Sequence, residues 1–167
     1  MIAPRERIVL GVDPGLAKMG WGVIDGAGPS FRCIAYGSLR TSGEEPHADR
    51  LRRIYDELVR VIALHRPGVM AVEEVFQGRN AKSALLAGEG RGACILAGAN
   101  AGLPVVEVAA SVAKLGVTGS GRASKPQVQA MVRRILGLAE PPRPVDAADA
   151  LAVALTYAQR RRSPILR

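Results

Sequence analysis

The sequence predicts an α/β fold: a mixed sheet of about five strands, three antiparallel and then parallel, with helices on both faces. Three observations lead to this fold class. The first 40 residues contain three apolar or alternating runs separated by Gly- and Pro-containing turns, which is typical of an antiparallel meander. The middle of the chain alternates helical patterns with short apolar runs, as chains with buried parallel strands do. The end of the chain is Ala- and Leu-rich with helical spacing and supplies further helices.

Three strands are expected first. An aliphatic run predicts a strand over Arg7–Gly11, which a Pro-Gly pair ends. Trp21–Asp25 forms the second strand, and Ser30–Leu39 forms the third after a Gly- and Pro-rich turn. This meander places Asp13 at one end of the sheet.

The next elements alternate between helix and strand. Apolar residues three and four apart predict a helix over Pro46–His65. Val69–Val75 has the pattern of a buried parallel strand, although it contains two acids. Asn80 can cap a helix over Ala81–Ala101, and Leu103–Val108 follows as the next strand.

The last elements are helical. A short helix is expected over Ser111–Leu115, followed by a flexible loop over Gly116–Gly121. Ser124 has Pro two residues after it and Gln three residues after it, which predicts a capped helix that runs to about Leu136. A final helix is expected over Val145–Arg160, with cations at its carboxyl end.

Composition limits the class of protein. A chain of 167 residues and 17.6 kDa fits a single domain over residues 1–167. The formal net charge of +8 and the pI of about 10.3 favour a polyanionic partner such as nucleic acid. No apolar run is long enough to span a membrane and the start does not resemble a signal peptide, so we expect a soluble cytoplasmic protein. The two cysteines lie far apart, which favours buried thiols over a disulfide framework.

Four acids lie where a purely structural sequence would avoid them. Asp13 ends the first strand, Glu73 lies at the end of another strand with Glu74 beside it, and Asp146 and Asp149 share one face of the last helix. Carboxylates in apolar surroundings need a compensating charge, either from Arg side chains or from a divalent cation. Oxygen ligands without a His or Cys cluster suit Mg²⁺ or Mn²⁺. Taken singly, each acid has an ordinary alternative, and Asp146 could be a helix N-cap.

A basic protein with a carboxylate metal site suggests phosphodiester hydrolysis, in which two cations about 3.5 to 4 Å apart clamp the attacking water and the leaving oxygen. The sequence has no nucleophile elbow, Walker loop or Rossmann fingerprint. Its only histidines, His47 and His65, lie on or beside the first helix, where surface roles are expected.

Six segments resemble the RuvC family of bacterial Holliday junction resolvases, and they follow the family order over nearly the whole chain. The segments are Gly11-Val12-Asp13-Pro14-Gly15, Gly20-Trp21-Gly22-Val23-Ile24, Ala71-Val72-Glu73-Glu74-Val75-Phe76, Asn80-Ala81-Lys82-Ser83-Ala84-Leu85, Ser124-Lys125-Pro126-Gln127-Val128-Gln129 and Asp146-Ala147-Ala148-Asp149-Ala150-Leu151-Ala152.

The resemblance implies a ribonuclease H-like fold, a homodimer, and paired symmetric incision of four-way DNA junctions during recombination and repair. It also implies two Mg²⁺ ions per site, which Mn²⁺ can replace, and the RuvA and RuvB branch-migration proteins as partners. By position, the metal ligands would be Asp13, Glu73, Asp146 and Asp149. Glu74 takes a place often occupied by an amide in the family, and its role is an open question.

Other positions would contact DNA. Lys114 and Lys125 match basic residues beside the scissile strand, where they would stabilise transition-state charge. Phe76 matches an aromatic residue at the crossover that stacks on an unpaired base, although an ordinary core Phe is the alternative. Weaker candidates for backbone contacts are Arg79, Asn80, Arg91 and Arg122.

The small residues of the helix Asn80–Ala101 suggest a place in the dimer interface, with burial inside the monomer as the alternative. Three other functions stay open at this point. They are a non-catalytic protein that binds structured DNA or RNA, a nucleotide-using phosphotransferase of the actin-like fold, and a ribonuclease H-like nuclease that acts on RNA.

Overall fold

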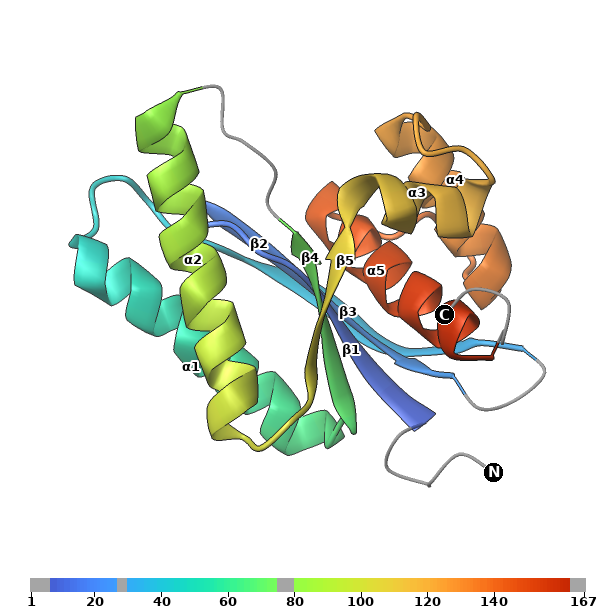
Figure 1. The fold of residues 1–167 in the computed structure, drawn as a ribbon, viewed down its shortest axis with the longest axis horizontal. Coiled ribbons are helices and arrows are strands. Elements are labelled where there is room, and N and C mark those ends of the chain that lie inside the picture. Colours follow the sequence, from blue (N-terminus) through green and yellow to red (C-terminus); the bar gives the residue numbers. More distant parts are fainter. Residues whose placement is uncertain (1–6, 27–29, 75–79, 163–167) are drawn as a thin grey trace.

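Five strands form one mixed sheet with helices on both of its faces (Figure 1), and the predicted fold class is confirmed. The computed structural model describes residues 7–26, 30–74 and 80–162. The strands are β1 (Ile8–Asp13), β2 (Lys18–Asp25), β3 (Arg32–Arg40), β4 (Val69–Glu74) and β5 (Val105–Ala109).

Five helices surround the sheet within the described residues. They are α1 (His47–His65), α2 (Ala81–Asn100), α3 (Ala110–Thr118), α4 (Lys125–Leu136) and α5 (Val145–Arg162). Of the helices in this part of the chain, none is both long enough and apolar enough to cross a membrane.

The strand order is β3-β2-β1-β4-β5. The first three strands pair antiparallel, whereas β4 runs parallel to both β1 and β5. Val12 of β1 is paired with Val72 of β4, so the next residues, Asp13 and Glu73, lie side by side at the same edge of the sheet. The parallel pairing therefore brings together two acids that are 60 residues apart in sequence.

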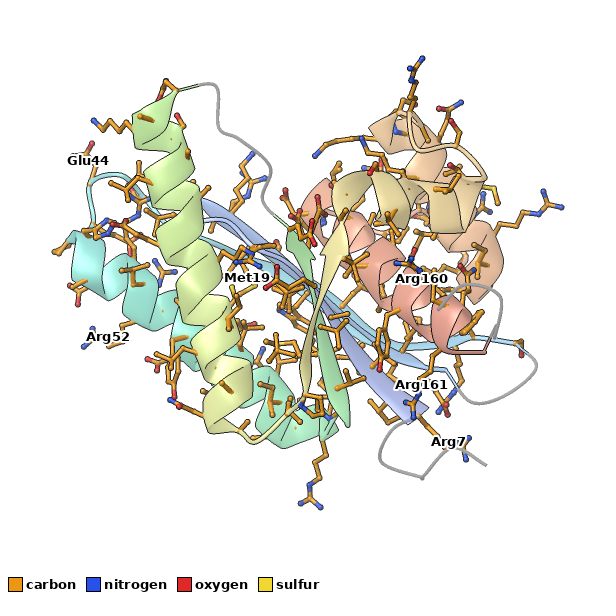
Figure 2. All side chains as sticks on the ribbon, in the orientation of Figure 1. Arg7, Met19, Glu44, Arg52, Arg160 and Arg161 are labelled. Atoms are coloured by element: carbon orange, nitrogen blue, oxygen red, sulfur yellow. The ribbon has the colours of Figure 1, made fainter. Side chains whose placement is uncertain are left out.

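The helices divide between the two faces of the sheet. In Figure 1, α1 and α2 lie on one side, and α3, α4 and α5 lie on the other. Strand residues alternate between these layers: Leu10 and Val12 belong to the apolar cluster under α1 and α2, whereas Val9 packs with α5. Met19, labelled in Figure 2, is fully buried in the cluster under α1 and α2.

Glycines allow α5 to approach the sheet at backbone distance. A Cβ atom at Gly11 would lie 2.1 Å from the Ala150 carbonyl oxygen, and one at Gly20 would lie 2.0 Å from the Asp146 carbonyl oxygen. No side chain fits into either space. This contact places the first turns of α5, and with them the acids of that helix, beside the end of β1.

The start of α4 is fixed by the predicted capping box. The Ser124 hydroxyl accepts a hydrogen bond from the Gln127 backbone N–H at 3.4 Å, and the Gln127 side chain accepts one from the Ser124 N–H at 2.8 Å. The cap places Lys125 at the first helical position.

Several boundaries differ from the expectation, among them those of β2, β3 and α3. β2 begins at Lys18 and β3 ends at Arg40, so both strands extend beyond their predicted ends. The predicted loop over Gly116–Gly121 was wrong in its first part, because α3 continues to Thr118. Gly116 fits closely against Thr156 of α5, whose hydroxyl donates to a carbonyl oxygen of α3, and this packing supports the additional helical turn.

Candidate active site

Side chains from five elements line one pocket of about 140 Å³. Its acids are Asp13 at the end of β1, Glu73 on β4 and Asp149 on α5. Its cations are Lys114 of α3 and Lys125 at the start of α4. The fold thus gathers five of the predicted site residues.

The alternation of β4 selects one of the two adjacent glutamates. Val72 is buried in the cluster under α1 and α2, so Glu73 faces the α5 side and Glu74 faces the α2 side. Glu73 lines the pocket and Glu74 does not. Of these two acids, only Glu73 therefore faces the pocket that contains Asp13.

Burial and mutual repulsion make the acids resist ionisation. Burial, followed by the charges of Glu73, Asp149 and Asp146, raises the pKa of Asp13 to about 8, although Lys125 opposes the shift. Burial and the nearby Asp149 raise the pKa of Glu73 to about 7. A pocket of this kind favours any ligand that brings positive charge.

Lys125 supplies part of that charge. Its Nζ donates a hydrogen bond to Oδ2 of Asp149 at 3.1 Å, and the Asp149 side chain is only 16% exposed. Burial alone would lower the pKa of Lys125, but Asp149, Asp13 and Asp146 outweigh this effect and raise it. Burial raises the pKa of Asp149 even though Lys125 opposes it. The ammonium group is thus held beside the acids in its charged form.

The donor set fits a hard divalent cation. Only carboxylate oxygens among the lining side chains could act as ligands, and no His or Cys belongs to the lining. Among the described residues, no three His, Cys, Asp or Glu side chains already form a group that could hold an ion. The acids converge on one pocket, with the Lys125 ammonium beside Asp149.

Asp146 does not line the pocket of the other three acids. It is in the first turn of α5 and lines a neighbouring groove, which shares Lys125 with the acidic pocket. α5 begins at Val145, so Asp146 is not the N-cap that the alternative interpretation would make it. Its charge nevertheless contributes to the raised pKa of Asp13.

The weaker candidates for DNA contact occupy varied positions. Asn80 caps α2 as predicted, because its Oδ1 accepts a hydrogen bond from the Ser83 N–H at 2.9 Å. Arg91 forms an ion pair with Glu107 of β5 at 2.5 Å. Arg122 is exposed on the connection before α4. Phe76 and Arg79 lie outside the described residues.

The neighbouring groove contains residues that sequence reasoning missed. Lys18, Arg40, Gln129 and Arg143 line it, together with Lys125. The predicted second and third strands ended short of Lys18 and Arg40, which hid the fact that these two cations are direct cross-strand partners. Continuing the hairpin pairing to the end of the ladder would have revealed them.

Comparison with known proteins adds to this geometry. The family described as crossover junction endodeoxyribonuclease RuvC matches residues 9–157. The chain belongs to the RuvC family. The RuvC of Pelotomaculum thermopropionicum is 48% identical over 151 residues, which cover 90% of this chain and 92% of that protein. The predicted family resemblance is confirmed.

Solved structures agree with the family assignment. RuvC of Thermus thermophilus in complex with a Holliday junction substrate matches with a TM-score of 0.88 and 39% identity, covering 93% of this chain and 95% of that one. The yeast mitochondrial Holliday junction resolvase shares the fold, with a TM-score of 0.67 at 12% identity over 95% of this chain and 80% of that one.

Proposed function

We propose that this member of the RuvC family resolves four-way DNA junctions by metal-dependent hydrolysis of phosphodiester bonds in two opposed strands. The family is one of endodeoxyribonucleases that act at crossover junctions, so the chain is a DNA-cutting enzyme. One structural observation supports the location of the chemistry: acids from β1, β4 and α5 converge on a single pocket beside two lysines.

Asp13, Glu73 and Asp149 would hold the divalent metal, and Asp146 would complete the set from the adjoining groove. Mg²⁺, or Mn²⁺ in its place, would activate water and stabilise the leaving oxygen, and the all-oxygen donor set suits two such ions. Lys114 and Lys125 border the same pocket and would hold the scissile phosphate and stabilise its developing charge. No protein nucleophile is needed for this chemistry.

A homodimer would match the two-fold symmetry of the junction, because each active site could face one of two equivalent strands. The outer face of α2 supports this arrangement. Leu85 and Leu96 lie about three turns apart and are 64% and 52% exposed. A Cβ atom at Gly88 or Gly92 between them would meet no atom of the described residues within 4 Å. By contrast, a Cβ atom at Gly90 would lie 2.8 Å from the backbone nitrogen of Leu16, so this glycine lets α2 pack closely on the loop that follows β1.

Resemblance to the family also makes the RuvA and RuvB branch-migration proteins the expected partners at the junction. The relatives are bacterial and the substrate is DNA, so we place the activity in the bacterial cytoplasm.

A panel of synthetic substrates in Mg²⁺ tests the proposed function. Four-way junctions, flaps and RNA–DNA hybrids are incubated with the wild-type protein, and the cut sites are mapped on each strand. We expect paired nicks at symmetric positions in the four-way junction. Preferential cutting of the hybrid would contradict the proposal and favour the RNA-directed nuclease.

Asp146→Asn separates an enzyme from a non-catalytic binding protein. We expect the variant to bind junctions at least as tightly as the wild type, because one negative charge near phosphate is removed, while cleavage falls by orders of magnitude. Unchanged cleavage would contradict a role for this acid in the reaction. A binding protein with incidental acids would show no cleavage in either form.

The dimer is tested with Leu85→Glu combined with Leu96→Glu. Charges on a buried apolar surface disfavour association, so light scattering is expected to give the mass of a monomer for this variant. Leu64→Glu is the matched control, because Leu64 is 65% exposed on α1. A dimer that persists in the double variant, or that is lost equally in the control, would exclude this face of α2.

A further inference from the structure

We propose that the groove beside the acidic pocket binds the phosphodiester backbone of the cleaved strand next to the cut, through Lys18, Arg40 and Arg143. This inference rests on the proposed function and names a further binding site for the same DNA. The groove has a volume of about 830 Å³, and it adjoins the acidic pocket because Lys125 lines both.

The pairing of β2 and β3 places two of these cations opposite each other. Lys18 is the direct cross-strand partner of Arg40. Lys18 lies on the α5 side of the sheet, because two residues further on Gly20 meets Asp146 of α5. Like charges that face each other across a strand pair are destabilising. A bound anion would remove that repulsion, so the pair is suited to a phosphate group.

Among the described residues, these cations have no counterion. Within the part of the chain that the structure describes, no carboxylate lies at ion-pair distance from Lys18, Arg40 or Arg143. By contrast, Arg53 and Arg91 each form an ion pair with a nearby acid. Three of the four arginines of α1, Arg52, Arg53 and Arg60, are neutralised by acids in this way, whereas the groove leaves its positive charge available.

Asp146 is the one acid of the groove, and it lies with four cations: Lys18, Arg40, Lys125 and Arg143. This excess attracts an anionic ligand to the side of the acidic pocket. None of the described residues that line the groove is aromatic, so the lining offers no stacking platform for a base. The chemistry therefore favours backbone phosphates over bases.

Two further features describe the surroundings of the groove. Gln129 of α4 donates a hydrogen bond from Nε2 to the Pro142 carbonyl oxygen at 3.0 Å, which holds the connection that carries Arg143. Lys18 also borders a second depression that contains Arg50 and Ser83. Lys18 thus connects the groove to this depression at the end of the β2–β3 pair.

The test compares two triple variants that remove the same charge. Lys18→Gln, Arg40→Gln and Arg143→Gln are combined in the groove variant. The control combines Arg52→Gln, Arg60→Gln and Arg66→Gln, from α1 and the residue that follows its end. Figure 2 shows Arg52 on α1, which lies on the opposite side of the sheet from α5.

Binding of a fluorescent four-way junction is measured by anisotropy with EDTA present, over a series of salt concentrations. We expect the groove variant to lose affinity by on the order of tenfold to a hundredfold, and its salt slope to fall by about 2 to 3. Single-turnover cleavage in Mg²⁺ at subsaturating protein is expected to fall together with the affinity, because the cleaved strand is bound less often. A groove variant with the affinity and salt slope of the control would overturn the proposal.

The position of the contacts is tested with methylphosphonates, which replace one charged phosphate at a time on either side of the cut. Wild type is expected to lose affinity at phosphates within the groove, and the groove variant is expected to lose less at the same positions. Equal losses at every position would contradict the proposed site. If the wild-type protein does not cut junctions in Mg²⁺, the proposed function itself fails, whichever phosphates the groove binds.

Discussion

The two faces of the sheet are made from the same strands but differ in what they contribute. Toward α1 and α2, the strands present bulky apolar residues such as Leu10, Met19 and Met70, which are fully buried. Toward α5, β1 presents Gly11 and then Asp13. One face is a conventional core, whereas the other combines close helix packing with a polar site at its edge.

This difference shows how alternation allows stability and chemistry to share one strand. In β4, Met70 and Val72 support the core under α2, while Ala71 and Glu73 face α5 and the acidic pocket. A change on one face should therefore affect cleavage, and a change on the other should affect folding. Three substitutions and one pH dependence test that division.

The largest effect is expected for Asp13→Asn on the α5 face. Removal of this carboxylate should lower the single-turnover rate of junction cleavage by on the order of 10³-fold or more, because a central electrostatic element of the site is lost. Glu74→Gln is the matched control on the opposite face of the sheet and should retain the wild-type rate. Similar losses of cleavage rate in the two variants would contradict the assignment of the chemistry to the α5 face of the sheet.

The second effect concerns the core under α1. Leu58 is fully buried, and Leu58→Ala is expected to lower the free energy of unfolding by about 2 to 5 kcal/mol in urea titrations. Leu64→Ala, at a position that is 65% exposed, should change it by less than about 0.5 kcal/mol. Cleavage per folded molecule should be unchanged in Leu58→Ala. A loss of cleavage per folded molecule would contradict the claim that this face of the sheet contributes to stability alone.

The third substitution, Gly20→Ala, should affect both properties. The new Cβ atom would lie 2.0 Å from the Asp146 carbonyl oxygen, so α5 must shift away from β2. We expect a loss of about 1 to 3 kcal/mol in unfolding free energy, together with reduced cleavage because Asp146 moves with the helix. Gly43→Ala, where the added atom meets nothing within 4 Å, provides the control.

The smallest effect is a pH dependence of the metal-free protein. Burial and neighbouring acids raise the pKa of Asp13 to about 8 and that of Glu73 to about 7, above their ordinary values of 3.8 and 4.5. The folded state therefore holds protons that the unfolded chain has released. The stabilising contribution is complete below about pH 4 and is lost as the pH rises through the folded-state values.

Thermal unfolding with a chelator should show a lower Tm at about pH 8 than at about pH 5, by roughly 2 to 4 °C or more for a chain of this size. Asp13→Asn removes one of the responsible groups, so its Tm should fall less over the same range. Added Mg²⁺ should reduce the loss in wild type by compensating the acids. A wild-type Tm that rises toward pH 8 under chelation would contradict the electrostatics of the pocket.

Local patterns were sufficient to predict most of the fold. Apolar spacing located α1, and the cap at Ser124 located α4, because both signals depend on residues within a few positions of each other. The misplaced ends of β2, β3 and α3 depend on distant partners. The Thr41 N–H bonds to the Ala17 carbonyl oxygen, which continues the pairing of the hairpin past Lys18.

The candidate site, like the fold, could be predicted only where the signal lies within a few residues of the sequence. Acids in apolar surroundings are visible in the sequence, and for this reason Asp13, Glu73 and Asp149 could be selected before their positions were known. The groove could not be found in this way, because exposed cations such as Arg40 and Arg143 are common. They indicate a binding site only when the fold brings several of them together. The ion pair of Arg91 with Glu107 likewise depends on how α2 lies against β5.

The acidic pocket needs α5, which is the last described element along the chain. During synthesis on the ribosome, β1 and β4 are complete long before Asp149 has left the exit tunnel. A nascent chain therefore lacks the Asp149 carboxylate in this pocket until α5 docks on the sheet, and the proposed metal site forms only at that step. The order in which the elements are translated thus makes this pocket one of the last features of the described fold to form.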